Sequence, residues 1–168
     1  MSDPGTEARG PGSAPSRRVL LGLGSNLGDR VGHLRGAIAA LGDEVVATSD
    51  VFETAPVGGP DQGRYLNVVV AMRTAVGARA LLARGQALEA DASRERTVRW
   101  GPRTLDVDIL WIDGERHAEP DLAVPHPRMA ERAFVMVPLA DVAPDLVPAG
   151  WSAPGQEVTR LGPLGAVS

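Results

Sequence analysis

The chain has 168 residues, a hydrophobic fraction of 43% and a net charge of −4. These values fit one soluble domain with its own core and argue against a broad nucleic-acid-binding surface. Cysteine is absent, which excludes disulfides and thiolate metal sites and is compatible with a reducing cytosol, and no apolar run approaches the roughly 18 residues of a membrane span. Every basic residue is an arginine, so any phosphate contact must use guanidinium or backbone N–H groups.

The N-terminal stretch predicts a tail rather than a folded element. Residues 1–17 are rich in Gly, Pro and Ser and lack the apolar segment of a signal peptide, so we expect them to be disordered, in preference to a cleaved targeting sequence. Residues 18–168 are expected to form a single domain.

The first third of the domain predicts a strand, a helix and a second strand. Val19–Leu23 is a short apolar run typical of a buried strand, and apolar residues at helical spacing predict a helix over Asp29–Leu41, ended by Gly42. Residues 44–53 have the pattern of a strand. The glycines of "GLGSNLG" are spaced one residue too widely for a dinucleotide fingerprint, so we predict a tight turn entering the helix.

The middle of the chain predicts a functional loop, a strong strand and a helix. Residues 54–64 form a loop by their Gly and Pro content, and loops of this length are often functional. In the strand predicted over residues 65–74, Tyr65 and Asn67 share one face, opposite the apolar residues. A helix is expected from Thr74, as a possible N-cap, to Ala92.

The next strand carries two acids. In "WGPRTLDVDIL", Leu105, Val107, Ile109 and Trp111 are expected on one face, and Asp106 and Asp108 on the other. After a turn at Asp113-Gly114, helices are expected over roughly residues 129–137 and after Pro138, whereas the last thirty residues have only loose structure by pattern. The resulting order, β-α-β-β-α-β, predicts an α+β, ferredoxin-like fold with a mostly antiparallel sheet sandwiched by helices.

The acidic pair permits two interpretations. Two carboxylates at alternate positions are often solvated groups on an edge strand. Here they lie within a run of apolar residues, where their repulsion would be relieved by a bound cation. Oxygen ligands without His or Cys favour Mg²⁺, and the pair could hold two ions. Asp106 and Asp108 are therefore candidate metal ligands.

Neighbouring residues extend this site. Four arginines crowd residues 93–103, and although such a loop is usually only solvated, beside a Mg²⁺ site it could close over phosphates. Tyr65 with Asn67 could hold a flat heterocycle, although a tyrosine at a strand start is commonly core packing. His126 is either structural or a donor to a phosphate oxygen.

Four segments, "GLGSNLGDR", "YLNVVV", "RWGPRTLDVDIL" and "VPHPRMAERAFVMVPLADVAPDL", closely resemble the 6-hydroxymethyl-7,8-dihydropterin pyrophosphokinase family of folate biosynthesis, in order from about Val19 to Pro148. The resemblance implies a ferredoxin-like, cytoplasmic, usually monomeric enzyme that moves the pyrophosphoryl group of ATP to the dihydropterin and releases AMP. It implies no nucleic-acid or membrane partner. The chain departs from some family members at Thr97 and Pro127, and its 94–100 loop is one residue shorter.

The resemblance also implies roles for individual residues. The implied catalytic residues are Arg94, Arg103, Asp106 and Asp108, of which the two aspartates bind two Mg²⁺. The implied pterin contacts are Thr54, Val57, Tyr65, Asn67, Trp100 and Phe134. The implied ATP contacts are Gln86, Glu89, Arg94, Arg96, Arg103, Ile109, His126 and Arg132.

Two rival functions remain open at this point. Another Mg²⁺-dependent nucleotidyl transferase would also suit paired aspartates on a ferredoxin-like sheet, and it would release pyrophosphate instead of AMP. A non-catalytic regulatory domain of the same architecture would not need Asp106 and Asp108 and would not bind Mg²⁺-ATP. No general base is identified, because a metal-bound aspartate is a poor base.

Overall fold

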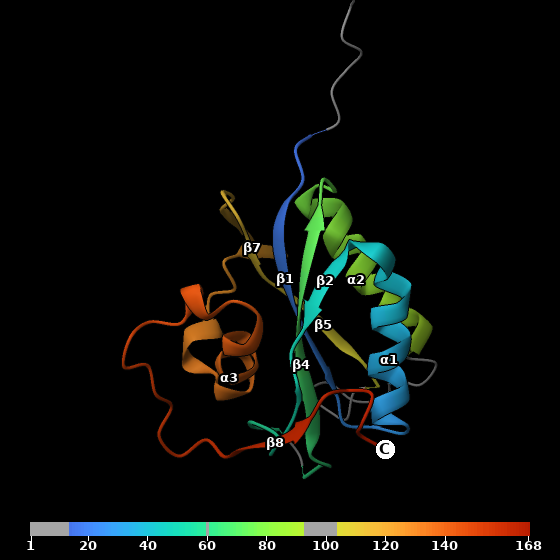
Figure 1. Cartoon of the computed structure of the whole chain (residues 1–168), viewed down its shortest axis with the longest axis vertical. Helices are drawn as coiled ribbons and strands as arrows, with labels where there is room; N and C mark the ends of the chain where they lie inside the picture. The colour runs from blue at the N-terminus through green and yellow to red at the C-terminus, as the bar shows by residue number, and fades with distance from the viewer. Residues whose placement is uncertain (1–13, 60, 93–103) are drawn as a thin grey trace, which may run out of the picture.

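The computed structural model describes residues 14–59, 61–92 and 104–168, and a central antiparallel sheet organises this part of the chain (Figure 1). Its strands are β1 (Arg17–Ser25), β2 (Val45–Thr48), β3 (Val51–Thr54), β4 (Tyr65–Thr74), β5 (Asp106–Ile112) and β8 (Val158–Gly162). The strand order is β5-β1-β4-β3-β8, and β2 pairs with β4 beside β3. With β2 and β3 taken as one broken strand, this is the ferredoxin-like arrangement, and the predicted fold class is confirmed.

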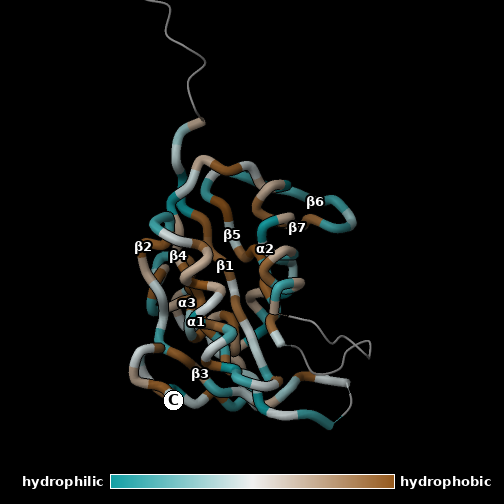
Figure 2. The backbone as a smooth tube through the Cα atoms, turned by 90° about the vertical axis from the view of Figure 1, so that its right-hand side faces the viewer, coloured by the Kyte–Doolittle hydropathy of each residue, from teal (hydrophilic) through white to brown (hydrophobic). Residues whose placement is uncertain are grey.

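Helices cover both faces of the sheet. The helices α1 (Arg30–Leu41) and α2 (Ala78–Ala92) lie on one face, and α3 (Ala133–Val142) lies on the other (Figure 1). The remaining elements are η1 (Gly42–Glu44), β6 (His117–Glu119), β7 (Leu122–Val124), η2 (Met129–Glu131) and η3 (Pro144–Leu146). Each face has its own apolar cluster, and the most hydrophobic stretches run along the central strands (Figure 2).

The first helix begins and ends as the sequence predicts. The Asp29 carboxylate accepts the Gly32 N–H at 2.9 Å, which satisfies one of the free donors of the first turn. Gly42 ends the helix with a φ of 69°, a conformation in which a side chain would be strained. The predicted turn at Asp113-Gly114 is also present.

The strand predicted over residues 44–53 is broken. It consists of β2 and β3, separated at Ser49, whose side chain is 3% exposed. The Ser49 hydroxyl accepts the Val69 N–H at 2.9 Å and donates to the Asp50 carbonyl at 2.7 Å. Because this side chain competes with the regular ladder, the chain changes direction here, and a purely apolar pattern does not reveal it.

Replacing Ser49 with alanine is expected to destabilise the protein by about 1–3 kcal/mol, because the buried Val69 N–H loses its acceptor. Denaturant unfolding of the purified variant measures this loss. Thr48→Ala is the matched control, since Thr48 is exposed on β2. Equal stability of the Ser49 variant and the control would contradict the structural role of this hydroxyl.

Two predicted helix boundaries are wrong. Thr74 is not an N-cap but the last residue of β4, and its hydroxyl donates to Glu44 and accepts the Val76 N–H. The helix begins at Ala78, four residues later. Pro138 does not separate two helices either, since it lies inside α3, where burial against the sheet outweighs the hydrogen bond that proline cannot donate.

The strand with the acids departs from simple alternation at one point. Leu20 pairs with Trp111 and Leu21 with Ile109, which leaves Leu110 as an extra residue in β5. Trp111 therefore packs on the α3 face of the sheet. The prediction that Trp111 and Leu105 lie on the same face of the strand is wrong. The acids precede this bulge, so the face predicted for them is correct.

The C-terminal residues hold more structure than predicted. After α3 the chain arcs around that helix and returns to the sheet as β8, which pairs with β3 (Figure 1). The β6–β7 hairpin was likewise not predicted. Across the described ranges, the helices fall short of the length and hydropathy that crossing a bilayer requires.

Candidate active site

A cavity of about 670 Å³ opens on the α3 side of the sheet. Its lining comes from β1, β3, β4 and β5, from the loop after β3, from the residues around the start of α3, and from the C-terminal segment. This volume is typical of small-molecule sites.

Glycines in β1 leave room for this cavity. Gly22 and Gly24 line it and lie opposite Asp108 and Asp106, respectively, in the pairing of β1 with β5. A Cβ atom on Gly24 would come within 3.2 Å of the Asn67 side-chain oxygen. The strand was predicted to end at Leu23, before a turn, but β1 continues to Ser25 and so includes Gly24 as well as Gly22. Only Gly28, with a φ of 68°, is in the turn.

The two aspartates lie as predicted. Asp106 and Asp108 are half-buried on one face of β5, and both line the cavity. In the described ranges no cluster of three or more His, Cys, Asp or Glu side chains could hold a metal. Magnesium nevertheless fits two carboxylates, because it commonly binds one or two of them and completes its shell with substrate phosphates and water.

A buried polar pair faces the same space. Asn67 donates its side-chain N–H to the Thr54 hydroxyl at 2.8 Å, and the two residues are 6% and 4% exposed. Both line the cavity. Because the hydrogen bond fixes the amide, its oxygen is held in place as a hydrogen-bond acceptor in the cavity wall.

Aromatic side chains come from two elements. Tyr65 begins β4 and Phe134 belongs to the first turn of α3, and both line the cavity. The Arg132 guanidinium lies over the Phe134 ring, 5.4 Å from its centroid. This cation–π contact orients the ring and brings a positive charge to the cavity wall.

The loop predicted to be functional forms part of the rim. Val57 lines the cavity and is 68% exposed, an unusual exposure for a valine. Asn26 holds the far end of the loop, since its side-chain N–H groups donate to the Gln62 side chain at 3.1 Å and the Gly63 carbonyl at 3.0 Å. Asn26 of the "GLGSNLG" stretch thus supports the loop.

Four predicted ATP contacts lie outside the cavity lining. The Ile109 side chain is in the core on the opposite face of β5, and Gln86 is exposed on α2. Glu89 accepts the Val107 N–H at 2.9 Å, between the two aspartates. Because β5 ends the sheet, this bond holds its outer edge in place.

His126, the fourth of these residues, is held against β5. Its backbone N–H donates to the Leu110 carbonyl at 2.9 Å, and its Nδ1 accepts the Arg128 N–H at 3.2 Å. Burial lowers the pKa of His126, the nearby Arg132 and Arg128 lower it further, and Asp106 opposes them. The imidazole is therefore neutral at neutral pH, with its proton on Nε2 as a potential donor.

The remaining predicted residues, Arg94, Arg96, Trp100 and Arg103, lie outside the described residues. Conversely, the lining includes polar residues that were not predicted as site residues, among them Arg128, Glu131 and Gln156. Arg128 and Glu131 form an exposed ion pair at 3.3 Å. Arg128 could have been proposed from the sequence, because it follows His126-Pro127 and precedes Arg132. The C-terminal region has no pattern that would have indicated Gln156.

An acidic pair in the wall of a cavity that also has arginine, amide and aromatic side chains is typical of enzymes that transfer phosphate groups to small molecules. The family model of 7,8-dihydro-6-hydroxymethylpterin-pyrophosphokinase (HPPK) matches residues 20–144. The chain belongs to this family.

Curated relatives match most of the chain. A protein of Methylorubrum extorquens named 2-amino-4-hydroxy-6-hydroxymethyldihydropteridine pyrophosphokinase is 42% identical over 88% of this chain and 96% of its own length. A Bacillus subtilis protein of the same name is 44% identical over 74% of this chain and 77% of its own.

Solved structures share the fold at low identity. A crystal structure of HPPK-DHPS in complex with substrates has a TM-score of 0.59 at 12% identity, covering 83% of this chain and 42% of the other. Wild-type Plasmodium falciparum HPPK-DHPS has a TM-score of 0.54 at 14% identity, covering 75% and 41%. This chain thus spans about two fifths of those longer chains.

Proposed function

We infer that the chain transfers the pyrophosphoryl group of ATP to the hydroxymethyl group of 6-hydroxymethyl-7,8-dihydropterin and releases AMP, a step of folate biosynthesis. The observation that carries this conclusion is the pair Asp106 and Asp108 in the wall of the cavity, in a chain of the HPPK family. The amide and aromatic side chains of the same cavity suit a flat, polar heterocycle.

Asp106 and Asp108 are the residues that would hold magnesium, and we propose two ions. Bound magnesium would neutralise phosphate charge, so that an alcohol oxygen can approach phosphorus. The glycines opposite the aspartates leave that part of the cavity free for the triphosphate. Arg132 adds positive charge beside Phe134.

The pterin is proposed to lie between Tyr65 and Phe134, with Asn67 and Thr54 at its polar edge and Val57 at the rim. This arrangement would hold the hydroxymethyl group in line with the phosphate chain, and such positioning is a large part of phosphoryl-transfer catalysis. Trp100 is proposed as a further pterin contact. Gln86, Glu89, Arg96, Ile109 and His126 are proposed to contact or support the ATP site.

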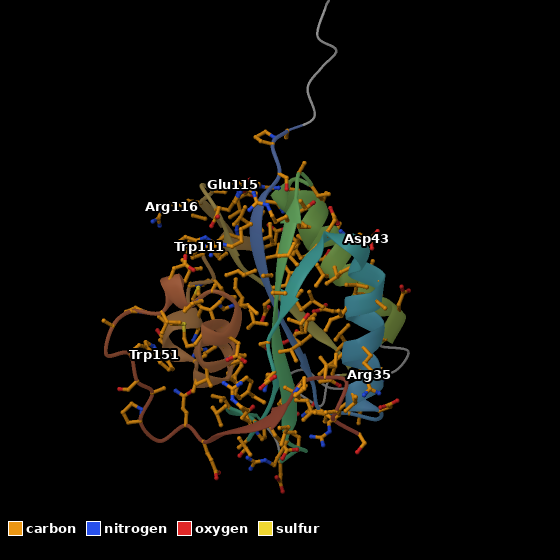
Figure 3. The ribbon with its side chains drawn as sticks, in the orientation of Figure 1. Arg35, Asp43, Trp111, Glu115, Arg116 and Trp151 are labelled. Atoms are coloured by element: carbon orange, nitrogen blue, oxygen red, sulfur yellow. The ribbon has the colours of Figure 1, made fainter. Side chains whose placement is uncertain are left out.

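The loop arginines Arg94 and Arg103 are proposed to offset charge on the transferring group. Arg94→Ala is expected to lower kcat about 100-fold with little change in dihydropterin binding, because it removes a cation needed mainly in the transition state. Steady-state kinetics and equilibrium dihydropterin binding measure the two effects. Arg116→Ala is the control, since Arg116 is exposed at the far end of the sheet (Figure 3). A defect confined to dihydropterin binding would contradict this role.

Nucleotide analysis of the reaction tests the proposed function. With ATP, Mg²⁺ and the dihydropterin, AMP is expected to appear in proportion to dihydropterin consumed. Release of pyrophosphate instead would assign the chain to the nucleotidyl transferases. Absence of Mg²⁺-ATP binding in calorimetry would favour a regulatory domain.

The proposal includes a cytoplasmic, monomeric enzyme with an N-terminal tail; the tail expected over residues 1–17 is one residue too long, since Arg17 already belongs to β1. Family resemblance supports the location and the oligomeric state. The start of β1 at Arg17 supports a domain boundary close to this residue.

A further inference from the structure

The C-terminal segment beyond the family match contributes to the cavity. The HPPK family model ends at residue 144, whereas Gln156 lines the cavity. Gln156 lies on the stretch that arcs around α3 before β8, which also carries Trp151 (Figures 1 and 3). A part of the chain outside the matched region therefore touches the proposed substrate space.

Gln156 holds the backbone on both sides of Arg132. Its side-chain oxygen accepts the Ala133 N–H at 2.8 Å, and its side-chain nitrogen donates to the Glu131 carbonyl at 2.8 Å. Ala133 is the first residue of α3, and the preceding Arg132 provides no side-chain cap. Gln156 thus satisfies a helix donor that would otherwise need water.

The segment that carries Gln156 is itself anchored at two ends. On one side Trp151 donates its indole N–H to the Ala130 carbonyl at 2.8 Å. On the other side β8 pairs with β3, where Val158 lies opposite Thr54. Arg160 fixes this strand further through ion pairs with Asp50 at 2.6 Å and Asp141 at 2.9 Å. The segment therefore connects the Thr54 wall of the cavity with the wall formed by α3.

The hydrogen bond between Gln156 and the Ala133 N–H affects the position of the adjacent Phe134. Phe134 follows Ala133, so a change at the start of α3 moves its ring. A rigid aromatic side chain has only two torsions with which to compensate, whereas the longer Arg132 side chain can reach around a small backbone displacement. Loss of the Gln156 bonds should consequently affect the aromatic wall more than the guanidinium.

From these contacts we propose that Gln156 is a positioning residue of the dihydropterin site, which acts through the start of α3 to place Phe134. This inference rests on the proposed function. Its predicted signature is a change in the KM for the dihydropterin with little change in kcat, since the ring contacts the substrate in the ground state and transition state alike.

The test compares Gln156→Met with Gln156→Glu in the full chain. Methionine has similar length but neither hydrogen bond, and the KM for the dihydropterin is expected to rise about fivefold, with kcat within about twofold. Glutamate keeps an acceptor for the Ala133 N–H at the helix start and is expected to restore most of the affinity. Glu157→Gln is the control, since the neighbouring Glu157 is exposed and does not line the cavity.

The outcomes separate the two claims. Wild-type protein that releases no AMP would contradict the proposed function. Active wild-type protein with an unchanged dihydropterin KM in Gln156→Met would overturn the inference alone. A fall in kcat at constant KM, parallel to a loss of folded protein in thermal unfolding, would also overturn it, because that is the result of a purely structural role. Equal dihydropterin KM values for Gln156→Glu and Gln156→Met would contradict the claim that Gln156 acts through the start of α3.

Discussion

Replacing Asp108 with alanine is expected to lower kcat by about 10³-fold or more while the protein folds as before. The carboxylate is half-buried in the cavity wall, opposite Gly22, and its proposed role is to hold magnesium at the ATP phosphates. Removing a metal ligand withdraws charge stabilisation from the transition state, which is commonly worth several kcal/mol. Initial rates at saturating substrates measure the effect.

The control for this variant is Asp91→Ala, which makes the same substitution at an exposed carboxylate on α2. It should keep wild-type kcat, and circular dichroism should show the same fold in both variants. Wild-type turnover by Asp108→Ala would remove the acidic pair from the mechanism. A recovery of activity at high magnesium concentration would instead support weakened metal binding as the cause.

The second large effect is expected at Asn67. Asn67→Ala should raise the KM for the dihydropterin about 100-fold, because the cavity loses a fixed hydrogen-bonding group for the heterocycle edge. It should also destabilise the protein by about 1–3 kcal/mol, since the buried Thr54 hydroxyl loses its partner. Steady-state kinetics and denaturant unfolding measure the two losses separately.

Thr54→Val separates these contributions. It removes the hydroxyl but keeps the Asn67 amide, so the KM should rise less than in Asn67→Ala. If both variants lose stability and neither changes the KM, the pair is a structural hydrogen bond and the proposed pterin edge lies elsewhere in the cavity.

Much of the fold follows from periodicity alone. The alternation in residues 65–74 and the helical spacing over residues 29–41 gave β4 and α1 nearly to the residue. The order of the predicted strands and helices was sufficient to predict the ferredoxin-like class. Such patterns are reliable where a segment is long and has one apolar face.

The errors occurred where a single residue outweighs the pattern. The Ser49 hydroxyl breaks a strand, and the extra Leu110 shifts Trp111 to the other face of the sheet. Pro138 remains within a buried helix. Each outcome depends on tertiary contacts, which a local hydrophobic pattern does not contain.

In the candidate site, the positions of the acidic, amide and aromatic side chains were predicted better than the boundary of the cavity. Alternation alone placed Asp106 and Asp108 on one face, and Tyr65 and Asn67 on another that the fold brings to the same cavity. Gln156 could not be predicted, because its role arises only when the C-terminal segment folds back onto α3. Hydrophobic periodicity contains no information about such long-range contacts.

The most direct measurement of the central claim follows the β-phosphorus of ATP. With ATP labelled at the β position, Mg²⁺ and 6-hydroxymethyl-7,8-dihydropterin, transfer of the pyrophosphoryl group carries the label into the pterin product and leaves unlabelled AMP. That is the predicted result, and Asp108→Ala should abolish it. Label that remains in ADP would indicate transfer of one phosphoryl group, and label in free pyrophosphate would indicate nucleotidyl transfer; either result would contradict the account.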